Sequence, residues 1–123
     1  MQKLNTIQQR EKLNEVYRQG ETGPGGAYHD YLIVCDRMEV DLKPVAMEIR
    51  FQKGPRKDPN ARHGITDQDL LEIVRDRMKA FCAGEMTGPH TERALSHVEA
   101  ALHHLNQRIE DRIARGVLGT MNK

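Results

Sequence analysis

The sequence predicts an α+β fold in which a small antiparallel β ribbon or sheet precedes a C-terminal antiparallel helical hairpin. Two observations support this prediction. Residues 27–52 contain stretches with the composition and alternation of strands, and residues 66–116 contain two apolar repeats with helical spacing. A chain of 123 residues fits one domain, which would span residues 1–123.

The N-terminal segment, residues 1–20, is polar and helix-prone, and its apolar side chains are sparse. We therefore expect a short helix or a partly ordered arm there. The following run from Gly20 to Gly26 is rich in glycine, which breaks regular structure. The chain shows neither an apolar leader at its start nor an apolar run of membrane-spanning length, so we expect a soluble, cytoplasmic protein.

Two extended stretches follow the glycine-rich run. Residues 28–35 are aromatic and β-branched, and residues 45–52 carry apolar side chains at their odd-numbered positions. We expect the two stretches to pair as an antiparallel ribbon or as part of a sheet. The loop-rich segment from Arg50 to Arg62 is basic, and Asp58 alone opposes its cations, which are Arg50, Lys53, Arg56, Lys57 and Arg62. Such a loop is able to meet an anion, although a solvated loop is the commoner explanation.

The hairpin is predicted from caps and apolar spacing. Thr66 precedes Asp67 and Asp69, a pattern typical of a helix start, because the acidic side chains favour the positive end of the helix dipole. Apolar residues at steps of three and four follow in two series, which are Leu71, Val74, Met78 and Phe81, and then Leu95, Val98, Leu102, Leu105 and Ile109. Gly116 is a natural stop for the second helix.

Composition favours association between chains. The sequence contains three tyrosines, two phenylalanines and no tryptophan, so a core built by one chain would be small. A small domain with few large side chains often gains stability by oligomerisation, and we expect a homo-oligomer. The formal net charge of +1 does not demand a polyanionic partner, so we consider nucleic acid unlikely.

Three arginines near the end of the second helix are the strongest functional signal. Steps of four and three residues place Arg108, Arg112 and Arg115 on one helical face. Guanidinium groups fixed in this way suit phosphate oxygens, which predicts a small phosphate-bearing ligand. A purely structural explanation remains open, since cations complement a helix C-terminus and Asp111 is able to pair with them. Against it, Arg108 and Arg112 continue the apolar seam of the helix, where a charge is costly unless a partner satisfies it.

Other chemistries have weaker support. The histidines lack a third ligand at metal-binding spacing, so no metal site is expected. Ser96 is the only serine, and its neighbour His97 splays away from it on a helix, so we expect no nucleophile–base pair. With no phosphate-binding glycine loop and no paired carboxylates, the sequence favours binding without turnover and without a cofactor.

Several stretches of this sequence resemble the phage Thoeris anti-defence protein 1 family, which shares a helical-hairpin domain with phage anti-CBASS cyclic-nucleotide sponges. The resemblance covers about residues 11–122. Its most specific part is the closing run Arg-x-x-x-Arg-x-x-Arg-Gly-Val-x-Gly-Thr, which starts at Arg108. The other stretches are Gly26-Ala27-Tyr28-His29-Asp30-Tyr31-Leu32-Ile33, Phe51-Gln52-Lys53-Gly54-Pro55, Gly64-Ile65-Thr66 and Asp69-Leu70-Leu71-Glu72-Ile73-Val74-Arg75-Asp76-Arg77-Met78.

The resemblance implies a phage sponge that acts in the host bacterial cytoplasm. Such a protein binds immune signalling nucleotides and keeps them from their effector without cleaving them. The nucleotides are cyclic ADP-ribose isomers and, for some members, cyclic di- and trinucleotides. Members assemble as dimers or hexamers. The implied pocket uses Phe81, Thr91, Arg108 and Arg112, with the two helix ends supplied by different protomers.

Two other functions stay open from the sequence. The first is an enzyme that cleaves cyclic nucleotides, which would return an altered nucleotide after incubation. The second is a nucleic-acid-binding regulator, whose affinity would fall steeply with salt.

Overall fold

The computed structural model describes residues 1–40 and 43–122. Contacts between residues divide the chain into two compact units. The first comprises Met1–Gly54 and Asn60–Ile65 and holds the β-sheet, whereas the second comprises Pro55–Pro59 and Thr66–Lys123 and holds both long helices. The organisation of residues 1–123 as one domain stays a prediction.

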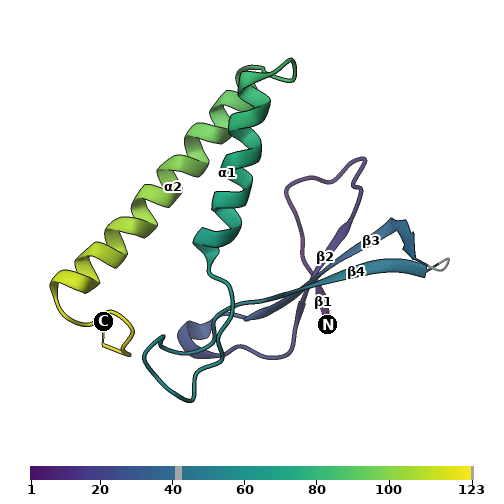
Figure 1. Ribbon diagram of the computed structural model, residues 1–123. Helices are drawn as coiled ribbons and strands as arrows, with labels where there is room; N and C mark the ends of the chain where they lie inside the picture. Colours follow the sequence, from purple (N-terminus) through teal and green to yellow (C-terminus); the bar gives the residue numbers. More distant parts are fainter. Residues whose placement is uncertain (41–42, 123) are drawn as a thin grey trace. The chain divides into compact units, whose positions relative to one another are not determined.

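The first unit contains a four-stranded antiparallel sheet with the strand order β1-β2-β3-β4 (Figure 1). A short 3₁₀ turn, η1 (Pro24–Gly26), lies in the glycine-rich connection. The expected antiparallel pairing of residues 28–35 with residues 45–52 is confirmed, with Tyr31 opposite Ile49 and Ile33 opposite Met47. The strands are β1 (Gln2–Lys3), β2 (Glu15–Gln19), β3 (Asp30–Val40) and β4 (Lys43–Arg50).

The sequence predicted a short helix or a partly ordered arm within residues 1–20, and the prediction of a helix is wrong. This segment contributes β1 and β2 instead, and β2 pairs with β3 along its whole length, from Glu15 opposite Val34 to Gln19 opposite Asp30. The strand is stabilised by a partner far along the chain, and such a partner overrides the local preference of a short polar segment.

An ion pair ties the end of the first unit to its sheet. Arg62 donates from Nη1 and Nη2 to the carboxylate of Asp30 at 3.2 and 3.0 Å, and from Nη2 to the carbonyl oxygen of Phe51 at 3.0 Å. Lys53 and Arg62 also exchange two backbone hydrogen bonds of 2.9 Å. Arg62 belongs to the basic loop, and here it closes that loop onto the strands.

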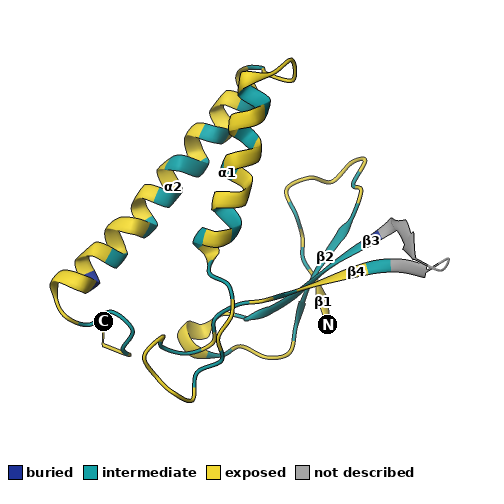
Figure 2. Cartoon of the chain, viewed as in Figure 1, coloured by how far each residue is buried: buried dark blue, intermediate teal, exposed yellow. Residues whose placement is uncertain are grey.

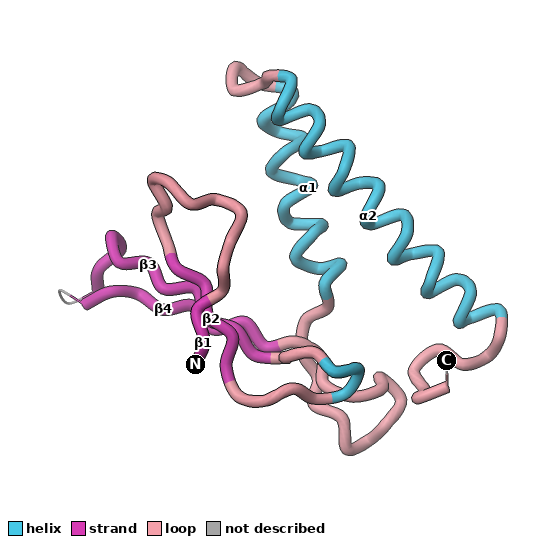
Figure 3. The backbone as a smooth tube through the Cα atoms, turned by 180° about the vertical axis from the view of Figure 1, so that it is seen from behind, coloured by secondary structure: helices cyan, strands magenta, loops and turns pink. Residues whose placement is uncertain are grey.

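The second unit is the predicted helical hairpin, formed by α1 (Asp67–Ala83) and α2 (Pro89–Ala114), which run side by side and antiparallel (Figures 1 and 3). The predicted start at Thr66 is confirmed. The Thr66 side chain accepts from the Asp69 amide, and the Asp69 carboxylate accepts from the Thr66 amide, so both form a capping box.

Half-buried residues mark the contact between the helices. In α2 they include every residue of the predicted apolar series from Leu95 to Ile109. In α1 the series differs at one position, because Val74 is 39% exposed whereas its neighbour Arg75 is half-buried. The Arg75 guanidinium reaches across to Glu99 of α2 at 2.9 Å, and this ion pair explains why a charged side chain lies on the inner face.

Few side chains are fully buried in either unit, as Figure 2 shows. Among the described side chains, the buried ones are Cys35 of β3, at 3% exposure, and Arg112 of α2, at 9%. The most enclosed residue of the hairpin is therefore a cation.

Candidate functional site

The candidate site lies where α2 extends beyond the start of α1. The 26 residues of α2 span about 39 Å, against about 25 Å for the 17 residues of α1. Near the start of α1, Gln68 shares a groove with Asn106 and Ile109. The next inner position of α2, Arg112, therefore lies close to the level at which α1 begins, and the chain's own C-terminal residues cover it.

Arg112 is bound by backbone oxygens. Its Nη1 donates to the carbonyl of Asn122 at 2.9 Å, and its Nη2 donates to the carbonyls of Val117 and Thr120, each at 3.0 Å. No carboxylate pairs with it among the described residues. A cation in the last turn of a helix is favoured by the helix dipole, and three charge-assisted hydrogen bonds offset the loss of water.

The residues after α2 form a turn whose shape is set by glycine. Gly116 has a φ of +72° and donates its amide to Ile113 O, while the Val117 amide donates to Arg112 O, each at 3.0 Å. This pair of bonds is a Schellman motif, so the predicted stop at Gly116 is confirmed. We use the name C-terminal turn for residues 117–122.

The other two arginines differ in their surroundings. Arg115 pairs with Asp111, one turn earlier, at 2.9 Å, which is the structural pairing that the sequence left open. Arg108 is exposed and makes no hydrogen bond or ion pair with any described residue. Arg108 is thus the arginine of the series whose donors are available to a ligand.

The remaining predicted site residues lie at the opposite end of the hairpin. Phe81 is near the end of α1, and Thr91 is near the start of α2. Thr91 precedes Arg108 by 17 residues, or about 25 Å along one helix. One chain does not bring them together. The Phe81 ring is half-buried, and the Arg77 guanidinium lies 5.3 Å from its centroid, a cation–π arrangement.

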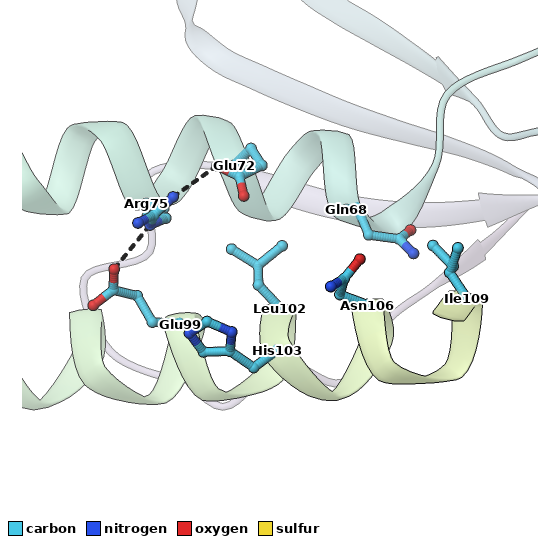
Figure 4. A pocket seen from close by; sticks show the side chains of 8 residues that line it. All are labelled: Gln68, Glu72, Arg75, Glu99, Leu102, His103, Asn106 and Ile109. Atoms are coloured by element: carbon cyan, nitrogen blue, oxygen red, sulfur yellow. Dashed lines mark hydrogen bonds and ion pairs between the residues drawn. The ribbon is translucent and has the colours of Figure 1, made fainter. Parts of the chain in front are cut away.

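A groove of about 400 Å³ runs between the helices, and its lining does not include any of the five predicted residues (Figure 4). Leu102 and Ile109 give it apolar surface, and the amides of Gln68 and Asn106 point into it from facing helices. The remaining lining residues are Glu72, Arg75, Glu99 and His103. These side chains can exchange hydrogen bonds with a small polar molecule.

Charge in the groove is largely internally compensated. Arg75 bonds to Glu99 at 2.9 Å and to Glu72 at 3.5 Å, and these hydrogen bonds, led by that to Glu99, raise the pKa of Arg75. This groove could not be predicted from the sequence, because Gln68 and Asn106 have no distinctive spacing. The available signal was a polar residue at an inner position of each helix.

Within residues 1–40 and 43–122, no three histidine, cysteine, aspartate or glutamate side chains gather as metal ligands would. Neither helix in this part of the chain combines the length and the apolar character needed to cross a bilayer.

Comparison with known proteins gives two matches. The family model of the Acb2/Tad1 hairpin domain matches residues 43–110, more than half of the chain. A protein called Thoeris anti-defense 1, from Bacillus phage SBSphiJ7, is 35% identical over 75 residues. That alignment covers 61% of this chain and 52% of the relative, so the chain spans about half the length of the relative. The family match includes most of both helices, and the chain belongs to the Acb2/Tad1 hairpin family.

Proposed function

We propose that this protein is a phage anti-defence sponge, which binds an immune signalling nucleotide and withholds it from its effector without cleaving it. The family assignment and the name of the phage relative support an anti-defence role. A cyclic ADP-ribose isomer is the proposed ligand, with cyclic di- and trinucleotides as further candidates. The protein would act in the cytoplasm of the infected bacterium.

The observation that carries the proposal is the state of Arg108. Its guanidinium is exposed and without a partner among the described residues, although the neighbouring Arg112 and Arg115 are both bound. A forked donor of this kind suits the two oxygens of a phosphate. The proposed site comprises Arg108 and the rest of the series with Phe81 and Thr91, in which the Phe81 ring would pack against the base.

The proposed site is completed by a second chain. Phe81 and Thr91 lie about 25 Å from the arginines along one hairpin, so a single ligand meets both groups only where two protomers are combined. Association is also favoured by exposed apolar side chains of the hairpin, among them Ile73 at 59% and Ile113 at 52%. We therefore propose a homo-oligomer, a dimer or a hexamer.

Recovery of the ligand after binding distinguishes sequestration from cleavage. A cyclic ADP-ribose isomer is incubated with the protein, the mixture is denatured by heat, and the released nucleotide is analysed by mass spectrometry. Sequestration returns the intact ligand at the amount that was bound. A linear or altered nucleotide would instead establish an enzyme. If the protein neither depletes the free ligand nor releases any on heating, the ligand is not bound.

The site assignment is tested by Arg108→Ala. We expect its affinity for the nucleotide to fall at least tenfold in calorimetry, which is about 1.4 kcal/mol or more, because a charge-assisted phosphate contact is lost. The matched control is Arg10→Ala, which removes an exposed arginine of the first unit, outside the proposed site. Native affinity in the Arg108 variant, or an equal loss in both variants, contradicts the assignment.

A further inference from the structure

We infer that Arg77 is a further ligand-binding residue at the Phe81 end of the proposed site, where the Phe81 ring holds its guanidinium in position for an anionic nucleotide. The inference rests on the proposed function, because the ligand is the same cyclic ADP-ribose isomer. It adds a cation to the end of the site that otherwise offers an aromatic ring and a hydroxyl, those of Phe81 and Thr91.

The first step is the contact between Arg77 and Phe81. Both residues belong to α1, and a separation of four residues places them on one face of the helix. Cζ of Arg77 lies 5.3 Å from the centroid of the Phe81 ring, within the range of a cation–π contact. The ring is half-buried and the arginine is exposed, so the ring is the more fixed partner of the pair.

The second step is that the fold makes no other use of this guanidinium. Arg77 forms no hydrogen bond or ion pair with any described residue. Arg75, two positions earlier on the same helix, instead bonds to Glu99 and Glu72. A cation–π contact at an exposed position contributes little to stability. The N–H donors of Arg77 are therefore available to a ligand.

The third step is the chemistry that these donors offer beside an aromatic ring. A base that packs against Phe81 brings its sugar and phosphates close to a guanidinium 5.3 Å from the ring centre. The guanidinium plane adds surface for a flat base, and its forked donors suit phosphate oxygens. Because the ring restrains the arginine side chain, less conformational freedom is lost when the ligand binds.

The distribution of charge over the proposed site supports the same assignment. An ADP-ribose isomer carries two phosphates. In the proposed arrangement the arginine series comes from one protomer, whereas Phe81 and Thr91 come from the other. Arg77 lies one helical turn before Phe81, so it gives the second protomer a cation of its own. Both chains then contribute positive charge to the diphosphate.

The assignment is tested by calorimetry on the full-length protein with a cyclic ADP-ribose isomer as the probe. Arg77→Gln removes the charge and the fork of donors. We expect its affinity to fall about tenfold and to depend less on salt, because a charge-assisted contact is lost, while its Tm stays unchanged. Arg77→Lys keeps the charge without the planar fork and should recover part of the lost affinity. Wild-type affinity in Arg77→Gln would overturn the inference.

Two controls separate a ligand contact from other roles of the arginine. Lys79→Gln removes an exposed cation of the same helix, two residues further on and on nearly the opposite side, and should leave the affinity unchanged. Native mass spectrometry should find Arg77→Gln in the same assembly as the wild type. An equal loss of affinity in both variants, or dissociation of Arg77→Gln into single chains, would contradict a ligand contact, because overall charge or assembly would then explain the loss.

A double-mutant cycle tests the part played by the ring. Phe81→Leu keeps an apolar side chain and removes the aromatic surface. Because the ring positions the guanidinium, we expect the combined variant Phe81→Leu, Arg77→Gln to lose less binding free energy than the two single losses added together. Additive losses would show that Arg77 acts independently of Phe81, and the positioning role of the ring would be wrong.

Failure of this inference is distinguishable from failure of the proposed function. A wild-type protein that does not bind the nucleotide ends both. A wild-type protein that binds, and that loses affinity with Arg108→Ala but not with Arg77→Gln, keeps the proposed function and ends the assignment of Arg77.

Discussion

At the residue scale, two arginines stabilise the backbone by donating hydrogen bonds to its carbonyl oxygens. Arg112 donates to three carbonyl oxygens of the C-terminal turn, and Arg62 donates to the carbonyls of His29 and Phe51 as well as to Asp30. The sequence placed both residues in groups able to bind an anion, the arginine series and the basic loop. Apart from the carboxylate of Asp30, their acceptors are backbone oxygens, which every residue carries. No pattern of side chains reports them, so this part of the site was beyond sequence analysis.

Acid should weaken the first unit through Asp30. The hydrogen bond from Arg62, with the nearby charges of Arg62, Arg50 and Lys53, holds the pKa of Asp30 below its usual value of 3.8. The unfolded chain thus takes up this proton at a higher pH than the folded chain. The stabilisation is complete above about pH 4 and is lost as the pH falls through the lower folded pKa.

We therefore expect the Tm of the wild-type protein to fall more steeply, as the pH decreases below about 4, than that of Asp30→Asn, which has no carboxylate to protonate. Asp76→Asn removes an exposed carboxylate from α1 and should keep the wild-type steepness. Equal slopes for the wild-type and Asp30→Asn proteins would show that this ion pair does not contribute to acid sensitivity.

At the element scale, local signals predicted the hairpin well and the sheet only in part. The capping residue Thr66, the apolar series of α2 and the stop at Gly116 each act within a few residues, so the sequence displays them directly. Strand β2 depends on pairing with β3, whose residues lie some way along the chain. Arg75 lies at the helix contact in place of the predicted Val74, because its guanidinium pairs with Glu99, 24 residues away. Such partners are set by the fold and not by neighbouring residues.

The capping box at the start of α1 should contribute to the stability of the folded protein. Thr66→Ala removes the hydroxyl that accepts from the Asp69 amide at 3.3 Å. We expect the free energy of unfolding to fall by about 1 kcal/mol, as measured by urea denaturation, because a helix amide loses its partner. Thr22→Ala, an exposed threonine outside the helices, should change it by less than about 0.5 kcal/mol. A Thr66 variant as stable as the wild type would contradict a role for the cap.

At the scale of the whole molecule, the two units bury very little apolar surface. Cys35 is the buried apolar residue of the described chain, while large side chains such as Ile73 and Ile113 are more than half exposed. A single chain organised in this way has a weak core, because apolar burial is the dominant favourable term in folding. The composition, with few aromatic residues, predicted this shortage and the association that would relieve it.

Association should therefore depend on the exposed apolar side chains of the hairpin. We expect native mass spectrometry to find the wild-type protein as a dimer or hexamer, and Ile73→Lys to shift it towards single chains, because burying an ammonium group at an interface is costly. Lys79→Ala, on the same helix, should leave the assembly intact. A wild-type protein that remains a single chain at micromolar concentration would end the proposal of a shared site.

The C-terminal turn also has a consequence for how this motif would be found elsewhere. Its acceptors are carbonyls, so these hydrogen bonds do not use the side chains of Leu118 and Met121. What must persist is an arginine followed by glycine four and seven positions later, here Arg112, Gly116 and Gly119. Distant homologues that share little else should be recognisable by this spacing at the close of their second helix.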